Sequence, residues 1–297
     1  MNKLFKHIVT AFVLIIVGTI IVVQFLPKPK LSFTERQNIN WAIQRLNSEL
    51  PQKIGTIGQF EKVTFNADTI AYYYVVYGGK ETDEFYEENY NEIRELMKYI
   101  VVCMNGHHNA GTKMAQWFDD VNIPIQVNIS TLGTKTFKWS YDGRELLDFI
   151  DKVRISPTEA LHTVIKVWIE LANLSLPLSA DDINLQSISN KAIVKSMSPD
   201  ERLMRILLEN DNIIFVSEIN KKDFSFDEVR INASTPQFIE AFTEEISKDA
   251  DVREFLDLIA TSRSNLIYRW CNVSYTDSAD VVIPYMVLKQ YSNNRFN

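Results

Sequence analysis

Two spacings of apolar residues alternate along the chain, one typical of helices and the other of strands. From Ile39 to Leu50, apolar side chains recur every three or four residues, which predicts a helix that ends at Pro51. The runs at residues 60–66 and 69–77 are rich in β-branched and aromatic residues. Because only Ala67-Asp68 separates these runs, we expect them to form a tight hairpin.

Further patterns complete the first half of the chain. A helical stripe of apolar residues runs from Tyr86 to Met104, and a second one runs from Met114 to Val121. Apolar and polar residues then alternate over Ile123–Ile129 and over Phe137–Tyr141. This alternation predicts two half-buried strands.

The same order of patterns recurs in the second half. A helical stripe from Leu161 to Leu171 ends before Leu176-Pro177, as the first stripe ends at Leu50-Pro51. A second hairpin is predicted from Ile183–Ile188 and Lys191–Met197, on either side of Ser189-Asn190. Helical stripes at 238–246 and 252–259 follow, and then two predicted strands at 266–272 and 281–288.

Capping signals support several of these helix starts. Ser32–Glu35, Ser156–Glu159, Ser198–Glu201 and Ser234–Gln237 all have the form of a capping box, in which a hydroxyl and a carboxylate or amide satisfy free backbone N–H groups. Each precedes apolar residues at helical spacing. We therefore expect a helix to begin at each of the four.

Together the patterns predict an α+β fold with two tandem repeats, each reading helix, hairpin, helix, helix, hairpin. The first repeat spans residues 31–150 and the second spans 151–297. The second carries an insertion near 201–226, from Glu201 to Phe226, with a short helix and an extra strand around Ile213–Val216. A repeat of this size usually forms a four-stranded antiparallel sheet covered by helices on one face.

The region before the repeats predicts a membrane anchor, residues 1–30. Residues 8–26 form an uncharged and mainly apolar stretch of 19 residues, which just spans a hydrocarbon core of about 30 Å. The alternative is a cleaved signal peptide, which would have a shorter apolar region and small residues at its end. Bulky residues continue here up to Leu26, so we favour an uncleaved single-pass helix. Because Lys3 and Lys6 lie in a short tail without acids, we expect a cytoplasmic N-terminus and an extracytoplasmic location for residues 31–297.

Composition narrows the range of partners. The formal net charge is −7, and the acidic residues are spread over the predicted helices. Nucleic-acid binding needs a basic face that displaces counterions from phosphates. The sequence has no cluster of basic and aromatic residues of this kind, so we exclude nucleic acid as a partner. The expected partners are the membrane, through residues 8–26, and a protein.

Few residues suggest chemistry. His107 and His108 lie next to each other in a glycine-containing loop, which is typical of a helix-breaking connection and lacks nearby metal ligands at the required spacing. Cys103 lies among apolar residues near a helix end, where a thiol pKa rises, so it is interpreted as a core residue. It forms a disulfide with Cys271 or remains a separate thiol. The sequence also lacks the common hydrolase, metalloprotease and nucleotide-binding motifs. We assign no catalytic, cofactor-binding or metal-binding residue and no cofactor.

One aromatic run could contribute to binding. Tyr72 and Tyr74 point to one face of their predicted strand, and Tyr73 and Tyr77 point to the other. One set should be in the core. The other forms either an exposed patch for a protein or glycan partner or a surface covered by the neighbouring repeat.

Segments of the first half resemble uncharacterised bacterial membrane-anchored or exported α+β proteins. The resemblance lies in Leu46–Pro51 before a hairpin, Val102–Asn105 in a helix, and Met114–Ser130 from helix to strand. It implies the same architecture and localisation and supplies no active site. The leading hypothesis is a membrane-tethered binding or scaffold protein of the cell envelope. The alternatives are an envelope enzyme of hydrolase type without a recognisable motif, and an inhibitor or immunity-type protein.

Overall fold

The computed structural model describes residues 31–54, 58–77, 79–103, 110–132, 135–174, 176–179, 200–248 and 250–291. The predicted anchor at 8–26, the predicted hairpin at 183–197 and the pair His107-His108 lie outside these ranges. Within them, no helix has both the length and the apolar character that are needed to cross a membrane.

The first half of the chain folds around a five-stranded sheet. Its strands pair in chain order: β1 (Gln52–Ile54), β2 (Gly58–Asn66), β3 (Thr69–Val76), β4 (Ile125–Thr131) and β5 (Thr136–Tyr141). β3 and β4 run parallel, and the other neighbours are antiparallel. The parallel step requires a crossover connection. Three helices supply it: α3 (Lys80–Glu88), α4 (Tyr90–Cys103) and α5 (Ala110–Val121). The helix α2 (Phe33–Asn47) precedes the sheet, and α6 (Gly143–Ile155) follows it.

In its described residues, the second half has the same order of elements around a second five-stranded sheet. Its strands are β6 (Leu178–Ser179), β7 (Glu201–Glu209), β8 (Asn212–Ile219), β9 (Asn265–Asn272) and β10 (Ser278–Ile283). Here β8 and β9 form the parallel pair. The crossover consists of α9 (Phe226–Ala233), α10 (Pro236–Ile246) and α11 (Ala250–Thr261), and the flanking helices are α7 (Pro157–Asn173) and α12 (Tyr285–Tyr291). The predicted α+β class, with sheets rich in antiparallel pairs, is therefore confirmed.

An asparagine at the end of the leading helix binds the sheet in the same way in both halves. The Asn47 side chain donates to the Val63 carbonyl and accepts from the Val63 N–H, each over 2.8 Å. Asn173 makes the same two bonds with Ile206, each over 2.9 Å. Each asparagine side chain thus makes the two backbone hydrogen bonds that a neighbouring strand would otherwise make with Val63 or Ile206. These bonds attach the end of the helix to the sheet.

Turns and helix ends also correspond. The hairpin predicted at Ala67-Asp68 is confirmed, with φ angles of 47° and 61°, and Asn210-Asp211 forms the same turn with 49° and 62°. Residues with positive φ also end α5 and α11, at Asn122 and Arg263. Positive φ at both central residues matches the right-handed twist of a two-residue hairpin.

The segment 201–226 differs from the expectation. The short helix predicted there is wrong, because β7 and β8 form a long antiparallel hairpin in the interior of the second sheet. The apolar residues Leu203, Ile206 and Leu208 are three and two residues apart, which departs from the regular period of two that indicates a strand. A bulge between Leu203 and Arg205 shifts the strand alternation and produces that spacing.

Other expectations need smaller corrections. The sheets have five strands instead of four, and each contains one parallel pair. Residues 281–288 form the end of β10 and most of α12 instead of one strand, because Pro284 separates the two. Of the four expected capping boxes, Ser32–Glu35 is confirmed. Ser156 makes no side-chain capping bond, α10 begins after Thr235, and Glu201 begins a strand.

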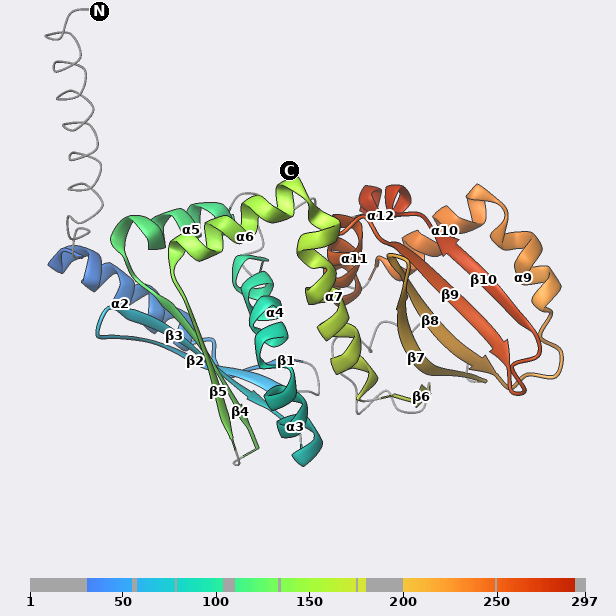
Figure 1. The fold of residues 1–297 in the computed structure, drawn as a ribbon, viewed down its shortest axis with the longest axis horizontal. Coiled ribbons are helices and arrows are strands. Elements are labelled where there is room, and N and C mark those ends of the chain that lie inside the picture. The colour runs from blue at the N-terminus through green and yellow to red at the C-terminus, as the bar shows by residue number, and fades with distance from the viewer. Residues whose placement is uncertain are drawn as a thin grey trace, which may run out of the picture.

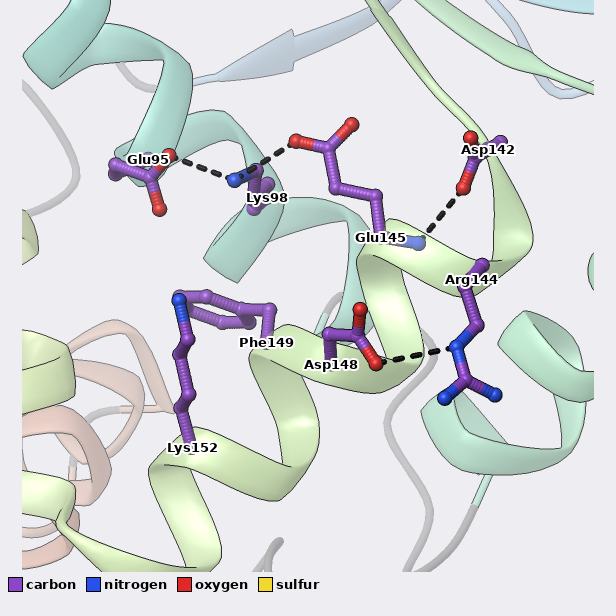
Figure 2. A pocket seen from close by; sticks show the side chains of 8 residues that line it. All are labelled: Glu95, Lys98, Asp142, Arg144, Glu145, Asp148, Phe149 and Lys152. Atoms are coloured by element: carbon purple, nitrogen blue, oxygen red, sulfur yellow. Dashed lines mark hydrogen bonds and ion pairs between the residues drawn. The ribbon is translucent and has the colours of Figure 1, made fainter.

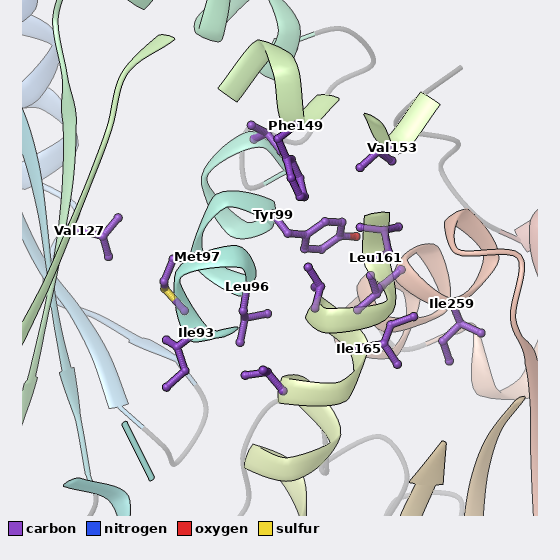
Figure 3. Close-up of a cluster of buried hydrophobic side chains, with 14 of the residues drawn as sticks. Ile93, Leu96, Met97, Tyr99, Val127, Phe149, Val153, Leu161, Ile165 and Ile259 are labelled. Carbon is purple, nitrogen blue, oxygen red and sulfur yellow. The ribbon is translucent and has the colours of Figure 1, made fainter. Parts of the chain in front are cut away.

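One hydrophobic core continues through both halves. The helices α4 and α7 lie between the two sheets (Figure 1). Figure 3 shows Tyr99 of α4 and Leu161 of α7 pointing toward one another, with Phe149 of α6 and Ile259 of α11 close by. Leu161 and Ile259 are completely buried. The contact between the halves is therefore a packed apolar interior.

Candidate functional site

Each sheet turns one face toward the helices and the core and the other face outward. In β5, Phe137, Trp139 and Tyr141 are buried, whereas the alternate residues of the same strand are exposed. Phe60 of β2 stacks on Tyr74, with ring centroids 4.8 Å apart, on the same inward face. The outward faces are thus defined by the remaining residues of each strand.

The outward face of the first sheet is polar. The strand register places Thr64, Ala71, Gln126 and Ser140 in one row across four strands. The adjacent row consists of Lys62, Tyr73, Asn128 and Lys138. Hydroxyl, amide and ammonium groups dominate both rows, as is usual for a sheet face in water.

The corresponding row of the second sheet is apolar. Leu207 pairs with Ile214, Ile214 with Ile267, and Ile267 with Val282, so four strands contribute one continuous row. We call these four residues the apolar row. Ile214 belongs to a small hydrophobic cluster separate from the main core, and of the described residues only β-strand side chains contribute to that cluster. Ile214 is 2% exposed, whereas Val282 at the sheet edge is 41% exposed.

Charged and polar side chains flank the apolar row. The next row contains Arg205, Val216, Arg269 and Asp280. Arg269 donates two hydrogen bonds to Asp280, over 2.9 and 2.8 Å, and these raise the pKa of the guanidinium. Arg205 is exposed at the edge of the face. An apolar centre with a charged border is the usual composition of a protein interface.

Cys271 lies on this same outward face, beside Val216. It is a free thiol and is buried. Burial raises its pKa, so the fraction of reactive thiolate is small. Cys103 is the last residue of α4. Cys271 therefore acts as an apolar side chain of the cluster.

The aromatic run divides as the strand alternation predicts. Tyr72 and Tyr74 face the core, and burial raises the pKa of both phenols. Tyr73 faces outward and receives the ammonium of Lys62 over its ring, at 4.9 Å. Tyr77, at the end of the strand, is 40% exposed and donates to Gln59. Tyr73 and Tyr77 therefore add two aromatic rings to a face whose other strand residues are mainly polar.

A charged depression of about 300 Å³ lies between α4 and α6 (Figure 2). Seven charged residues and one phenylalanine line it: Glu95, Lys98, Asp142, Arg144, Glu145, Asp148, Phe149 and Lys152. Its charges largely bind one another. Lys98 reaches Glu95 over 2.7 Å and Glu145 over 2.8 Å, and Asp142 caps α6 by accepting from the Glu145 N–H.

Glu145 is the centre of this network. Arg94 donates to both of its carboxylate oxygens, and Arg94 also lies over the Tyr141 ring at 5.0 Å. Burial alone would raise the pKa of Glu145, but the hydrogen bonds from Arg94 and Lys98 outweigh this effect and lower the pKa. Glu145 is therefore held as an anion and is a poor proton donor or acceptor near neutral pH.

The described residues do not form a metal site. Within those ranges, no three His, Cys, Asp or Glu side chains lie close enough together to hold an ion. Sequence reasoning also missed the apolar row. Its residues are ordinary strand residues, and only the register reveals that they adjoin.

No protein-family model matches the sequence, and neither a curated protein nor a solved structure matches the chain.

Proposed function

We propose that this chain is a membrane-tethered, extracytoplasmic binding protein whose second sheet docks a partner protein. The observation that carries the proposal is the apolar row, Leu207, Ile214, Ile267 and Val282, on an outward sheet face. The equivalent row of the first sheet is polar, so the fold itself does not require apolar residues at these positions. A second sheet with the same fold and a different outward chemistry is consistent with a binding role.

A protein fits this surface better than a small molecule does. Small ligands bind in concave pockets that bury most of their surface, whereas the apolar row is a line of side chains across four strands that ends at the exposed Val282. The border contains both cations and anions, including Arg205 and the Arg269–Asp280 pair. It can therefore form ion pairs with charged groups of either sign on a partner protein. The charged depression beside α6 is a poor candidate for an active site, because its central carboxylate, Glu145, is already bound by two cations.

We further propose that the two halves arose by duplication. They share the order of elements, the position of the parallel strand pair, the helix-end asparagines and the hairpin turns. These features are specific details of hydrogen bonding and backbone angle, which unrelated α+β halves would not be expected to share. The tether in this proposal is the predicted span at residues 8–26, and its short basic flank favours an extracytoplasmic location for the folded region.

Site-specific photo-crosslinking in the native membrane tests the docking surface. A photoreactive residue at Val282 should form one discrete adduct with another protein. The matched control is the same residue at Ser140, which holds the equivalent position in the first sheet and is also exposed. No adduct is expected there.

Three outcomes would contradict the proposal. The first is the absence of an adduct at 282, and the second is an equal adduct at both positions. The third is an adduct with twice the mass of the chain, which would show that the face joins two copies instead of a different protein. Charge reversal at the border, by Arg205→Glu, should weaken a genuine adduct without unfolding the chain, since Arg205 is exposed.

A further inference from the structure

The helix α2 packs on the molecule by a narrow stripe. Ile39 is its buried residue, and Ile43 is partly buried. Phe33 is 75% exposed and Trp41 is 64% exposed. Exposure of a single large apolar side chain is common, but Trp41 leaves most of a large indole ring in contact with solvent.

The surface around Trp41 is free of acidic residues. At 100° per residue, Thr34, Asn38 and Arg45 lie beside Trp41, opposite the stripe of Ile39 and Ile43. Phe33 and Gln37 extend this surface toward the N-terminus of the helix. The Arg45 guanidinium lies over the indole ring, 5.9 Å from its centroid. We call Phe33, Thr34, Gln37, Asn38, Trp41 and Arg45 the α2 outer face.

The α2 outer face also lies close in sequence to the predicted anchor. Six residues, 27–32, separate the end of the predicted span at Leu26 from the first residue of α2. Six extended residues reach at most about 20 Å. The start of α2 is therefore within that distance of the membrane surface wherever the span inserts.

We propose that the α2 outer face binds the headgroup region of the membrane that holds the anchor, with Trp41 inserted at the boundary between headgroups and acyl chains. Tryptophan and arginine suit this layer because an amphipathic ring and a cation each find both apolar and polar surroundings there. The uncharged polar neighbours remain hydrated. This inference rests on the proposed tether, and the experiment below separates the failure of one from the failure of the other.

Tryptophan fluorescence provides a direct test. The chain has five tryptophans, and residues 1–30 contain none. Trp41 is the one exposed tryptophan, and the other four are buried or partly buried. The full chain is reconstituted into phosphatidylcholine vesicles with or without brominated acyl chains, at a ratio that leaves at most one chain in each vesicle. Bromine quenches only indoles that reach the acyl boundary.

We expect brominated vesicles to quench part of the fluorescence, and Trp41→Phe to abolish this quenching. Trp117→Phe is the matched control and should retain it, because Trp117 lies on α5 and is partly buried. Quenching that is absent, or that survives Trp41→Phe, overturns the proposal. The low ratio excludes a second copy as the occupant.

Flotation of the same vesicles after alkaline extraction reports on the tether alone. If the chain floats and Trp41 is not quenched, the tether stands and the α2 outer face does not bind lipid. If the chain does not float, the tether is absent and this inference falls with it.

Discussion

Glu145 connects α6 to two cations of α4. It accepts from Arg94 through both carboxylate oxygens and pairs with Lys98, whose side chain is 10% exposed. Removing one member of a largely buried ion pair leaves the opposite charge without its partner, and this destabilises more than the pair itself stabilises. The network is therefore a structural clamp between two helices.

Glu145→Gln should lower the free energy of unfolding by about 1–3 kcal/mol at pH 7, because a neutral amide cannot hold both cations. Urea denaturation of the full chain in detergent micelles measures this change. The matched control is Asp148→Asn on the same helix. The Asp148 pair with Arg144 is solvent-exposed, so we expect a change below about 0.5 kcal/mol.

The lowered pKa of Glu145 gives the same residue a pH dependence. Between its folded and unfolded pKa values, the unfolded chain binds more protons. The stabilisation is thus complete above the ordinary pKa of a glutamate, about 4.3, and is lost as the pH falls through the lower folded value. The wild-type chain should lose more stability between pH 6 and pH 3 than Glu145→Gln does. An identical loss in both would show that Glu145 is not the group that titrates.

At the scale of elements, α5 and α6 approach so closely that a side chain does not fit between them. A Cβ atom on Gly143, the first residue of α6, would lie 2.1 Å from the backbone nitrogen of Asp119 and 2.6 Å from the Ala115 carbonyl oxygen. Both are backbone atoms of α5, so neither can rotate away. The glycine therefore sets the distance between the two helices.

Gly143→Ala should destabilise the chain by about 2–4 kcal/mol, since overpacking forces the backbone to move. Thermal or urea unfolding measures the effect. Gly79→Ala is the control, because a Cβ there meets nothing within 4 Å and Gly79 has ordinary negative φ before α3. That change should cost at most about 1 kcal/mol, because Gly79 is the N-cap of α3 and alanine is a poorer N-cap than glycine. Equal effects at the two positions would contradict the close approach.

Elements with local signals could be predicted from the sequence. Turn residues predict the hairpin at Ala67-Asp68. Clear periodicity of apolar residues predicts α5 and the strands β4 and β5. β7 could not be predicted, because its bulge gives Leu203, Ile206 and Leu208 an irregular spacing that only pairing with β8 explains. The helices α6 and α12 each begin after a single residue, Asp142 or Pro284, so α6 was missed and the strand pattern was continued into α12.

The candidate binding surface was also beyond sequence reasoning. Leu207 and Val282 are 75 positions apart in the chain, and they join one row only through two antiparallel pairs and one parallel pair. Strand pairing of this kind depends on how the crossover helices pack, and this packing cannot be predicted from the pattern of a single sequence. Conversely, the charges of the depression were visible in the sequence, but their mutual pairing was not.

At the scale of the whole molecule, the continuous core predicts that both halves unfold together. Leu161 is completely buried in the layer between the two sheets. Leu161→Ala should lower the free energy of unfolding by about 2–5 kcal/mol through loss of packing and the cavity left behind. Ile155→Ala is the control and should change little, since Ile155 is 80% exposed.

Hydrogen exchange resolves where this destabilisation acts. The amides of β4 in the first sheet and of β9 in the second should lose the same free energy of protection in Leu161→Ala, as they would in a single cooperative unit. A loss confined to β9 would show that the halves are independent folding units that happen to touch.

The asymmetry between α2 and α7 has a consequence for assembly. Leu161 and Val164 of α7 are completely buried, whereas the residues 126 positions earlier, Glu35 and Asn38 of α2, are exposed and polar. If each half adds to the next through its leading helix, as in a solenoid, the contact is head-to-tail and has no inherent end. Polar residues on the outermost helix act as the terminal cap of such an array. Under the proposed duplication, α2 is this cap, and it limits the protein to two units instead of a growing filament.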